Sequence, residues 1–295
     1  MNIWITGLNL SIDTVIKIES KDQYERLHAK QWKSVGSKGA NVMRSLITLG
    51  QCPHLIGLTW GSTGQCIQYM LKNICSNPMH LHILHHRTEE SRINIIKLEE
   101  NNEILISAES PKADRNLFTK YINHIADLIN SEDILILTGS FPKGLEVKDL
   151  MPLFTKLPDH HIWIDLKGQH LIEAYKYIPG GIFKVNHIES HDLTSRGILP
   201  NILIVTSATR TIAHINGTHI VVNIPRIDPV NTVGAGDVFM ASLVYEKVVQ
   251  GEDWETAIKK AAARATASTK TLGVSQWNED FAIKTLQAIT TFHSS

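Results

Sequence analysis

Cysteine is scarce in this sequence, and the spacing of the three that are present argues against two structural roles. Cys52, Cys66 and Cys75 are odd in number, and none forms a C-x-x-C pair. A disulfide framework and a cysteine-based zinc site are therefore not expected. We interpret the three residues as reduced thiols in the core of a cytoplasmic protein.

An excess of one charge is also missing, as is any long apolar run. The 295 residues include 29 basic and 29 acidic side chains, so electrostatics gives no reason to expect nucleic acid or an anionic membrane as a partner. The apolar stretch at residues 1–10 is interrupted by Gly7 and Asn9 and is too short to span a membrane. We expect a cytoplasmic protein with a small-molecule substrate.

Histidine is abundant, but its distribution does not indicate a metal site. The fifteen histidines are scattered, and pairs such as His85-His86 and His160-His161 are adjacent in sequence. Adjacent residues do not share a helix face, and no cysteine or carboxylate completes a metal-ligand spacing. We therefore expect solvated or hydrogen-bonded histidines.

Short apolar runs alternate with helical patterns through most of the chain. The runs lie at residues 3–6, 55–58, 134–137, 162–164 and 202–205, and the helical patterns at 39–49, 64–74, 117–130, 146–156 and 169–177. This alternation predicts an α/β fold with a mostly parallel sheet covered by helices on both faces. Asn216-Gly217, between two further apolar runs, predicts a β-hairpin.

Four segments follow a different pattern, in which apolar and polar residues alternate as in a half-exposed strand. They are residues 12–18, 28–34, 92–98 and 104–107. We expect them to assemble into a small sheet outside the main one. Because one face of such a sheet is solvated, it would suit a lid that closes over a site.

The strongest functional signal is the stretch from Asn231 to Asp237. Gly234, Ala235 and Gly236 are small enough for a close approach of the backbone to a ligand, and an apolar helical pattern follows. The start of a helix offers free N–H groups and the positive end of the helix dipole, which together favour an anion. Asp237 at that place could accept the proton of a hydroxyl that attacks a phosphoryl group.

Polar residues in other strand-end loops support a site at the same edge of the sheet. Gly36, Lys38, Gly39 and Asn41 precede a helix and could hold a polar or phosphorylated ligand, or simply form a turn. Asp13 follows the first strand and could accept two sugar hydroxyls, although a turn aspartate is the alternative.

Residue type alone does not decide the roles of several further residues. Arg92, with Asn94 on the same face of a lid strand, could bind a phosphate or be an exposed edge charge. Asn186 and Glu189 could organise water around Mg²⁺ or cap a helix. The loops at 138–144 and 206–211 carry hydroxyls at the same edge.

These motifs together resemble the PfkB, or ribokinase-like, carbohydrate kinases over essentially the whole chain. The stretch 232–237 is similar to the family's C-terminal signature, which implies an anion hole at Gly234, Ala235 and Gly236 and a catalytic base at Asp237. The stretch 36–41 resembles the sugar-binding glycine motif. Asn186 and Glu189 match the N-x-x-E pair, which implies a role with Mg²⁺ and the nucleotide phosphates.

Three features resemble the branch that includes 1-phosphofructokinase and tagatose-6-phosphate kinase. They are residues 9–13, 91–94 and 138–144, which are similar to N-P-x-x-D, T-R-x-N and S-G-S-x-P-x-G. The resemblance implies sugar binding by Asp13, Asn94 and Ser140, and binding of the substrate's phosphate by Lys38 and Arg92.

The nucleotide side departs from the family pattern. By resemblance, Lys184, Asn186, Thr206 and Ala208 would bind ATP together with the glycines of the anion hole. However, the family's T-x-G-x-x-G has alanine at 208 and threonine at 211, and added Cβ atoms could weaken or shift nucleotide binding. Leu10 and Ser37 also replace a proline and a glycine.

The resemblance implies one Rossmann-like, three-layer kinase domain over residues 1–295, with a lid of approximately 12–34 and 91–107. The expected enzyme transfers a phosphoryl group from ATP, with Mg²⁺, to a phosphorylated ketohexose, and a monovalent cation is a further candidate cofactor. Fructose 1-phosphate is preferred over tagatose 6-phosphate and fructose 6-phosphate. A homodimer through the lid is one expectation for its assembly. The alternatives are a kinase for a free sugar or nucleoside, and a weakly catalytic sugar-phosphate-binding protein.

Overall fold

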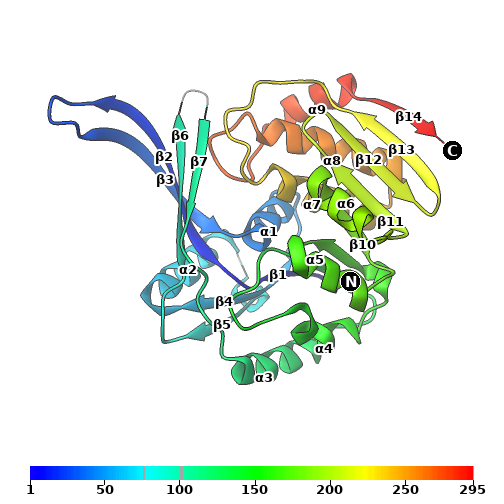
Figure 1. Ribbon diagram of the computed structural model, residues 1–295, viewed down its shortest axis with the longest axis horizontal. Coiled ribbons are helices and arrows are strands. Elements are labelled where there is room, and N and C mark those ends of the chain that lie inside the picture. Colours follow the sequence, from blue (N-terminus) through cyan, green and yellow to red (C-terminus); the bar gives the residue numbers. More distant parts are fainter. Residues whose placement is uncertain (76, 100–101, 295) are drawn as a thin grey trace.

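A ten-stranded sheet forms the centre of the molecule in the computed structural model, which describes residues 1–75, 77–99 and 102–294 (Figure 1). Its strands lie in the order β14 (Thr290–Ser294), β13 (Thr218–Asn223), β12 (Arg210–Ile215), β11 (Ile202–Thr206), β10 (Ile182–Asn186), β9 (Ile162–Asp165), β8 (Ile134–Thr138), β1 (Ile3–Gly7), β4 (His54–Trp60) and β5 (Leu81–His86). Neighbours from β11 to β5 are parallel, and the pairs from β11 to β14 are antiparallel. The prediction of a mostly parallel sheet is confirmed.

Helices cover both faces of this sheet and bury two separate apolar clusters. One face packs against α1 (Lys38–Thr48), α2 (Gly61–Ile74), α7 (Ala235–Val244), α8 (Trp254–Ser268) and α9 (Glu279–Ala288). The other packs against α3 (Arg115–Ala126), α4 (Met151–Phe154), α5 (Gly168–Tyr177) and α6 (His187–Ser195). Because β1 sends Ile3 and Ile5 into the first cluster and Trp4 into the second, it is buried on both faces.

A smaller sheet stands beside the main one and contains the four segments with alternating patterns. Its strands are β3 (Leu27–Gly36), β2 (Ser11–Lys21), β6 (Arg92–Glu99) and β7 (Asn102–Ser107). The β2–β6 pair is parallel, and the β2–β3 and β6–β7 pairs are antiparallel. Figure 1 shows the β2–β3 hairpin reaching away from the body, while the bases of β2 and β3 lie beside α1.

Local signals in the sequence explain several element boundaries. Asn216 and Gly217 adopt φ values of 51° and 87°, as expected for the tight turn that joins β12 and β13. The helix expected at 146–156 is instead a 3₁₀ turn, η2 (Val147–Leu150), followed by the short α4. Pro152 has no N–H to donate, so one continuous helix cannot form there.

Other parts of the sequence prediction were incomplete or wrong. The interpretation of all three cysteines as core residues fails for Cys52 and Cys66, which are exposed, whereas Cys75 is buried; all three are free thiols. The strands β5 and β14 were not predicted. Among the described residues, no helix is long and apolar enough to cross a membrane.

Candidate active site

Asp237 lies in the first turn of α7 and is buried, with 5% of the residue exposed. Gly234 precedes this helix with a φ of 83°, a left-handed conformation that glycine adopts at little cost. A Cβ atom on Gly234 would also lie 2.8 Å from Ser275 Oγ. Glycine is therefore required at this turn, which brings the positive end of the helix dipole close to the Asp237 carboxylate.

Asn41, from the first turn of α1, holds the Asp237 carboxylate in place. Its Nδ2 donates a hydrogen bond of 2.8 Å to Asp237 Oδ2. Burial raises the pKa of Asp237 to about 6; Lys38, Asn41 and Lys184 lower it, whereas the Asp165 carboxylate raises it. A carboxylate with a pKa near neutrality is suited to proton transfer at physiological pH.

Asp165, at the end of β9, is a buried carboxylate that joins two lysines next to Asp237. Lys38 Nζ lies 2.6 Å from Asp165 Oδ1, and Lys184 Nζ lies 3.2 Å from Asp165 Oδ2. Burial alone would raise the pKa of Asp165, but the two ammonium groups hold it below its usual value. Burial alone would lower the pKa of Lys38, but the carboxylates of Asp165, Asp237 and Glu189 raise it.

Lys184 also contacts the glycine turn. A Cβ atom on Gly236 would lie 3.0 Å from Lys184 Nζ, so the ammonium group is next to the first turn of α7. An ammonium group and helix N–H groups at one place can stabilise negative charge on a transferring phosphoryl group. Sequence reasoning missed Asp165, although it ends an apolar run, which is a position where ligand-binding carboxylates are common.

A second group of polar side chains surrounds Asp13 at the base of the small sheet. Asn94 Nδ2 donates to Asp13 Oδ1 at 2.7 Å, and Ser11 Oγ donates to the same oxygen at 2.9 Å. A Cβ atom on Gly36 would lie 1.9 Å from Asp13 Oδ1, so no other residue fits there without displacing the carboxylate. Asp13, Gly36 and Asn94 are thus brought together, as the sequence predicts.

Arg92 and Ser140 lie beside this group and are linked through Asn9. Arg92 Nη2 donates to the carbonyl oxygen of Asn9 at 3.0 Å, and Asn9 Nδ2 donates to Ser140 Oγ at 3.0 Å. Arg92 Nε and Asn9 Oδ1 are buried without a hydrogen-bond partner among the described residues. Burial lowers the pKa of Arg92, while Asp13 raises it.

The two cations that were expected to bind the substrate's phosphate face different neighbours. Arg92 lies near Asp13, whereas Lys38 interacts with Asp165, Asp237 and Glu189.

Close packing fixes the start of α1, since a Cβ on Gly39 would lie 2.2 Å from the carbonyl oxygen of Thr6.

Asn186 and Glu189 form a capping box at the start of α6. Asn186 Oδ1 accepts from the Glu189 N–H at 2.9 Å, and Glu189 Oε2 accepts from the Asn186 N–H at 2.8 Å. Helix capping, one of the two interpretations of this pair, is therefore observed. The negative charge of Glu189 nevertheless raises the pKa of Lys38 slightly, so the two side chains interact electrostatically.

Within the stretch 206–211, residues 207–209 form the turn between β11 and β12. Thr206 pairs with Asn186 across the strands, and its hydroxyl donates to the Val185 carbonyl at 3.2 Å. Ala208 lies at the exposed tip, and no residue of this stretch has a positive φ, so the alanine does not strain the turn. Thr211, the other replacement of a glycine, is buried in β12 and pairs with Thr206.

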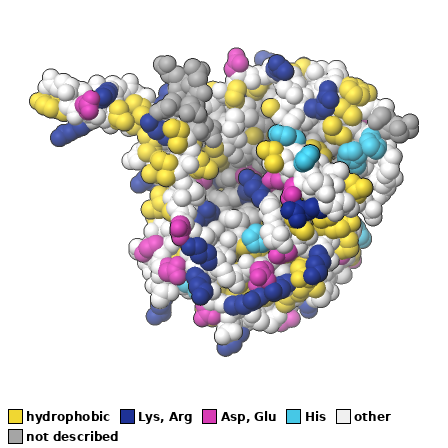
Figure 2. Space-filling view, in the orientation of Figure 1, with side chains coloured by type: hydrophobic (Ala, Val, Ile, Leu, Met, Phe, Trp, Pro, Cys, Tyr) yellow, Lys and Arg dark blue, Asp and Glu magenta, His cyan; other side chains and the backbone are white. Residues whose placement is uncertain are grey.

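The group of side chains around Asp237 and the group around Asp13 lie at one edge of the main sheet, close to the small sheet. Figure 2 shows a hollow in the middle of this face, between the small sheet and the body, with basic and acidic side chains around it. Among the described residues no cluster of three or more histidine, cysteine or acidic side chains could hold a metal ion by itself.

Comparison with known proteins gives consistent matches. The family model for "pfkB family carbohydrate kinase" matches residues 186–280. The chain is 26% identical over 287 residues to a 1-phosphofructokinase of Borreliella burgdorferi, covering 90% of this chain and 91% of that protein.

Solved structures share the fold over the full length. Phosphofructokinase-2 from Escherichia coli, in complex with substrates and products, matches with a TM-score of 0.82 and 18% identity over 98% of this chain and 99% of that one. A possible 1-phosphofructokinase from Thermotoga maritima matches with a TM-score of 0.82 and 19% identity over 100% of both chains. The comparisons confirm the ribokinase-like fold and the resemblance to the pfkB family carbohydrate kinases, and they indicate that the chain is a phosphotransferase of the sugar kinase type.

Proposed function

We propose that this protein transfers the γ-phosphoryl group of ATP to a hydroxyl of a phosphorylated ketohexose, with fructose 1-phosphate as the preferred substrate. Tagatose 6-phosphate and fructose 6-phosphate are the alternatives. The observation that carries the proposal is the buried Asp237 carboxylate at the start of α7, held by Asn41 beside two lysines. The 26% identity to a 1-phosphofructokinase supports the choice of substrate.

In this reaction Asp237 accepts the proton of the sugar hydroxyl while the hydroxyl oxygen attacks the γ-phosphorus and ADP leaves. The N–H groups of the turn at Gly234, Ala235 and Gly236 stabilise charge on the transferring group. Lys184, next to Gly236, adds a positive charge at the same place. Asp165 keeps that lysine in position.

The polar group at the small sheet binds the sugar phosphate. Asp13, oriented by Asn94, accepts hydrogen bonds from two sugar hydroxyls. Arg92 binds the phosphate already on the substrate, because only two of its five N–H donors are used, on Ser107 Oγ and on the Asn9 carbonyl. We assign Lys38, which is paired with Asp165, to the phosphoryl group in transfer rather than to the substrate's own phosphate.

ATP requires a divalent cation, and the residues at α6 fit Mg²⁺ bound through water. One oxygen of Glu189 caps the helix, while its charge acts on Lys38. Asn186, Lys184, Thr206 and Ala208 lie along the same edge and contact the nucleotide phosphates in this proposal. Bound Mg²⁺ neutralises charge on those phosphates.

A monovalent cation near residues 228–237 and a homodimer through the lid complete the proposal. A phosphofructokinase-2 structure from Escherichia coli is a complex with potassium, and another is a tetrameric inhibited form. The outer face of the small sheet exposes Ile93 and Ile106, which favours contact with a second copy. Light scattering and activity assays with and without K⁺ test these two points.

The proposal is tested by an ADP-release assay over ketose phosphates, free sugars and nucleosides. We expect turnover with at least one ketohexose phosphate, highest with fructose 1-phosphate. Turnover with a free sugar or nucleoside alone would replace the substrate assignment. Tight binding of sugar phosphate without ADP release would favour the weakly catalytic binding protein.

A further inference from the structure

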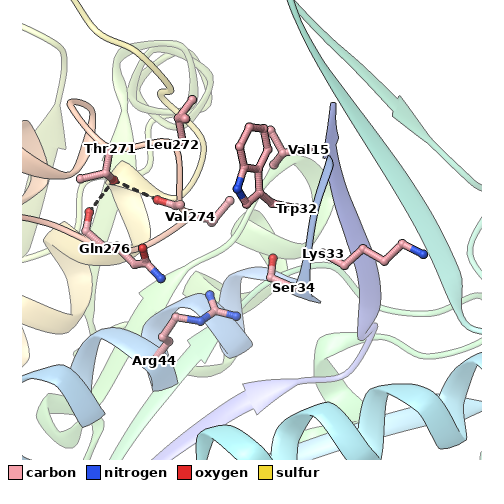
Figure 3. A pocket seen from close by; sticks show the side chains of 10 residues that line it. Val15, Trp32, Lys33, Ser34, Arg44, Thr271, Leu272, Val274 and Gln276 are labelled. Atoms are coloured by element: carbon pink, nitrogen blue, oxygen red, sulfur yellow. Dashed lines mark hydrogen bonds between the residues drawn. The ribbon is translucent and has the colours of Figure 1, made fainter. Parts of the chain in front are cut away.

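A cavity of about 410 Å³ lies between the small sheet, α1 and the loop that precedes α9 (Figure 3). Its walls come from β2 and β3, from Arg44 on α1, and from residues 271–276. The volume is within the range of small-molecule sites. None of the residues assigned above to the sugar, the nucleotide or the metal lines it, so its lining differs from that of the site around Asp237, which it adjoins through the contact of Arg44 with Asn41.

Two charged residues, Lys33 and Arg44, line this cavity, and the Arg44 guanidinium is fixed by two hydrogen bonds. Its Nη2 donates to the Val35 carbonyl at 3.0 Å, and its Nη1 donates to Asn41 Oδ1 at 3.1 Å. Among the described residues Arg44 forms no ion pair, although the negative charges of Asp13 and Asp237 act on it and raise its pKa against the lowering effect of burial. Two of its five N–H donors are used, so it can still bind an anion.

The opposite wall is aromatic and apolar. The Trp32 ring stands next to Val15 and faces Leu272 and Val274 across the cavity, and Trp32 remains 37% exposed (Figure 3). Lys33, the next residue on β3, points to the other side of the strand, away from Arg44. The cavity therefore combines one flat apolar surface with one fixed cation.

We propose that this cavity binds a small aromatic anion, with its ring against Trp32 and its carboxylate or sulfonate on Arg44. A ligand bound in this cavity affects Asp237, the proposed base, through a short chain of contacts. Arg44 holds Asn41 Oδ1, and Asn41 Nδ2 holds Asp237 Oδ2. An anion that draws the guanidinium away from Asn41 loosens the residue that orients Asp237. The loop at 274–275 also packs on Gly234, which gives a second contact with the same turn.

The binding test uses 2-naphthoate as the probe and 2-naphthamide as its neutral counterpart, measured by titration calorimetry on the full chain. We expect one naphthoate per chain, with much weaker binding of the amide. Arg44→Gln and Trp32→Ala should each weaken naphthoate binding by about tenfold or more. The second variant changes a partly exposed wall residue, so it tests the site even if Arg44→Gln does not fold.

Lys33→Gln is the matched control. It also removes a positive charge, and it does so one residue from Trp32, on a side chain that points away from Arg44. It should leave naphthoate binding unchanged. Equal loss in Lys33→Gln and Arg44→Gln, equal binding of the amide, or no naphthoate binding to the unchanged protein would overturn the proposal. This arm does not require kinase activity, so it is independent of the proposed function.

A kinetic arm separates this cavity from the sugar site. Saturating naphthoate should lower kcat with little change in KM for the sugar phosphate, and Trp32→Ala should abolish that effect. Competition with the sugar phosphate, seen as a rise in KM alone, would mean that the probe binds in front of Asp237 and would contradict a separate site.

Discussion

Asn41 Nδ2 donates a hydrogen bond of 2.8 Å to Asp237 Oδ2, which joins two residues that are 196 positions apart in the sequence. Asn41 lies near the start of α1 and Asp237 lies in the first turn of α7, and these helices pack side by side on the same face of the sheet. The contact joins the glycine motif at residues 36–41, the proposed sugar-binding motif, to the proposed base. The same hydrogen bond holds the buried Asp237 carboxylate in one orientation.

Activity should fall on the acid side as pH drops through about 6, the pKa of Asp237. The protonated carboxyl cannot accept the proton of the sugar hydroxyl, so kcat/KM should fall tenfold per pH unit below that value. A profile of kcat/KM from pH 4.5 to pH 8 measures this limb.

Asn41→Ala provides an internal check of that assignment. The Asn41 N–H stabilises the charged form of Asp237, so its loss should raise the pKa and move the acid limb to higher pH. An acid limb that stays in place in this variant would assign the ionisation to another group.

Asp165→Asn should destabilise the protein strongly, because it leaves the buried Lys184 and the partly buried Lys38 without their shared carboxylate. A loss of about 3–5 kcal/mol in the free energy of unfolding is typical for a broken buried pair. Urea denaturation measures it. Asp192→Asn, which breaks the exposed pair with Arg196, is the control and should cost less than about 1 kcal/mol.

Arg92→Gln should raise KM for a sugar phosphate by roughly 10–100-fold with a smaller effect on kcat, since a charge-assisted contact to the bound phosphate is lost. Lys38→Gln should act mainly on kcat, because Lys38 lies with Asp165 and Asp237. Lys143→Gln, at an exposed pair with Glu109, serves as the charge-matched control. If Arg92→Gln and Lys38→Gln gave the same change in KM, the division of their roles would be wrong.

Asp237→Asn should stabilise the folded protein at pH 7 while it removes the base. The folded pKa of about 6 lies above the ordinary value of 3.8, so the folded state binds the proton more tightly. The contribution of Asp237 to the stability of the unchanged protein therefore falls as pH rises from about 4 through 6. The variant should gain on the order of 2 kcal/mol at pH 7 and almost nothing at pH 4. Urea unfolding at the two pH values tests this, and an equal gain at both would contradict a buried charge.

Much of the fold and part of the site follow from local patterns. Apolar runs and helical periodicity predicted the parallel strands because those strands are buried on both faces, and Asn216-Gly217 fixed a hairpin through its backbone preference. The turn at Gly234 and the carboxylate of Asp237 could be read from one short stretch, since glycine and a helix start lie side by side in sequence.

The rest depended on contacts between distant segments. Asp165 has no motif around it, and its role became visible only when β9 and β10 brought it between Lys38 and Lys184. Lys38 was expected to share a phosphate with Arg92, but its orientation is set by Asp165, which the local sequence does not reveal. The helix expected near residue 150 failed because Pro152 interrupts its hydrogen bonds.

Steady-state turnover of the Asp237→Asn variant, with MgATP and the best ketohexose phosphate of the substrate screen, tests whether Asp237 is the catalytic base. We expect kcat to fall by ~10²–10⁴-fold, with binding of the sugar phosphate retained in calorimetry. A correctly folded variant that keeps near-normal turnover would contradict the assignment of Asp237 as the base.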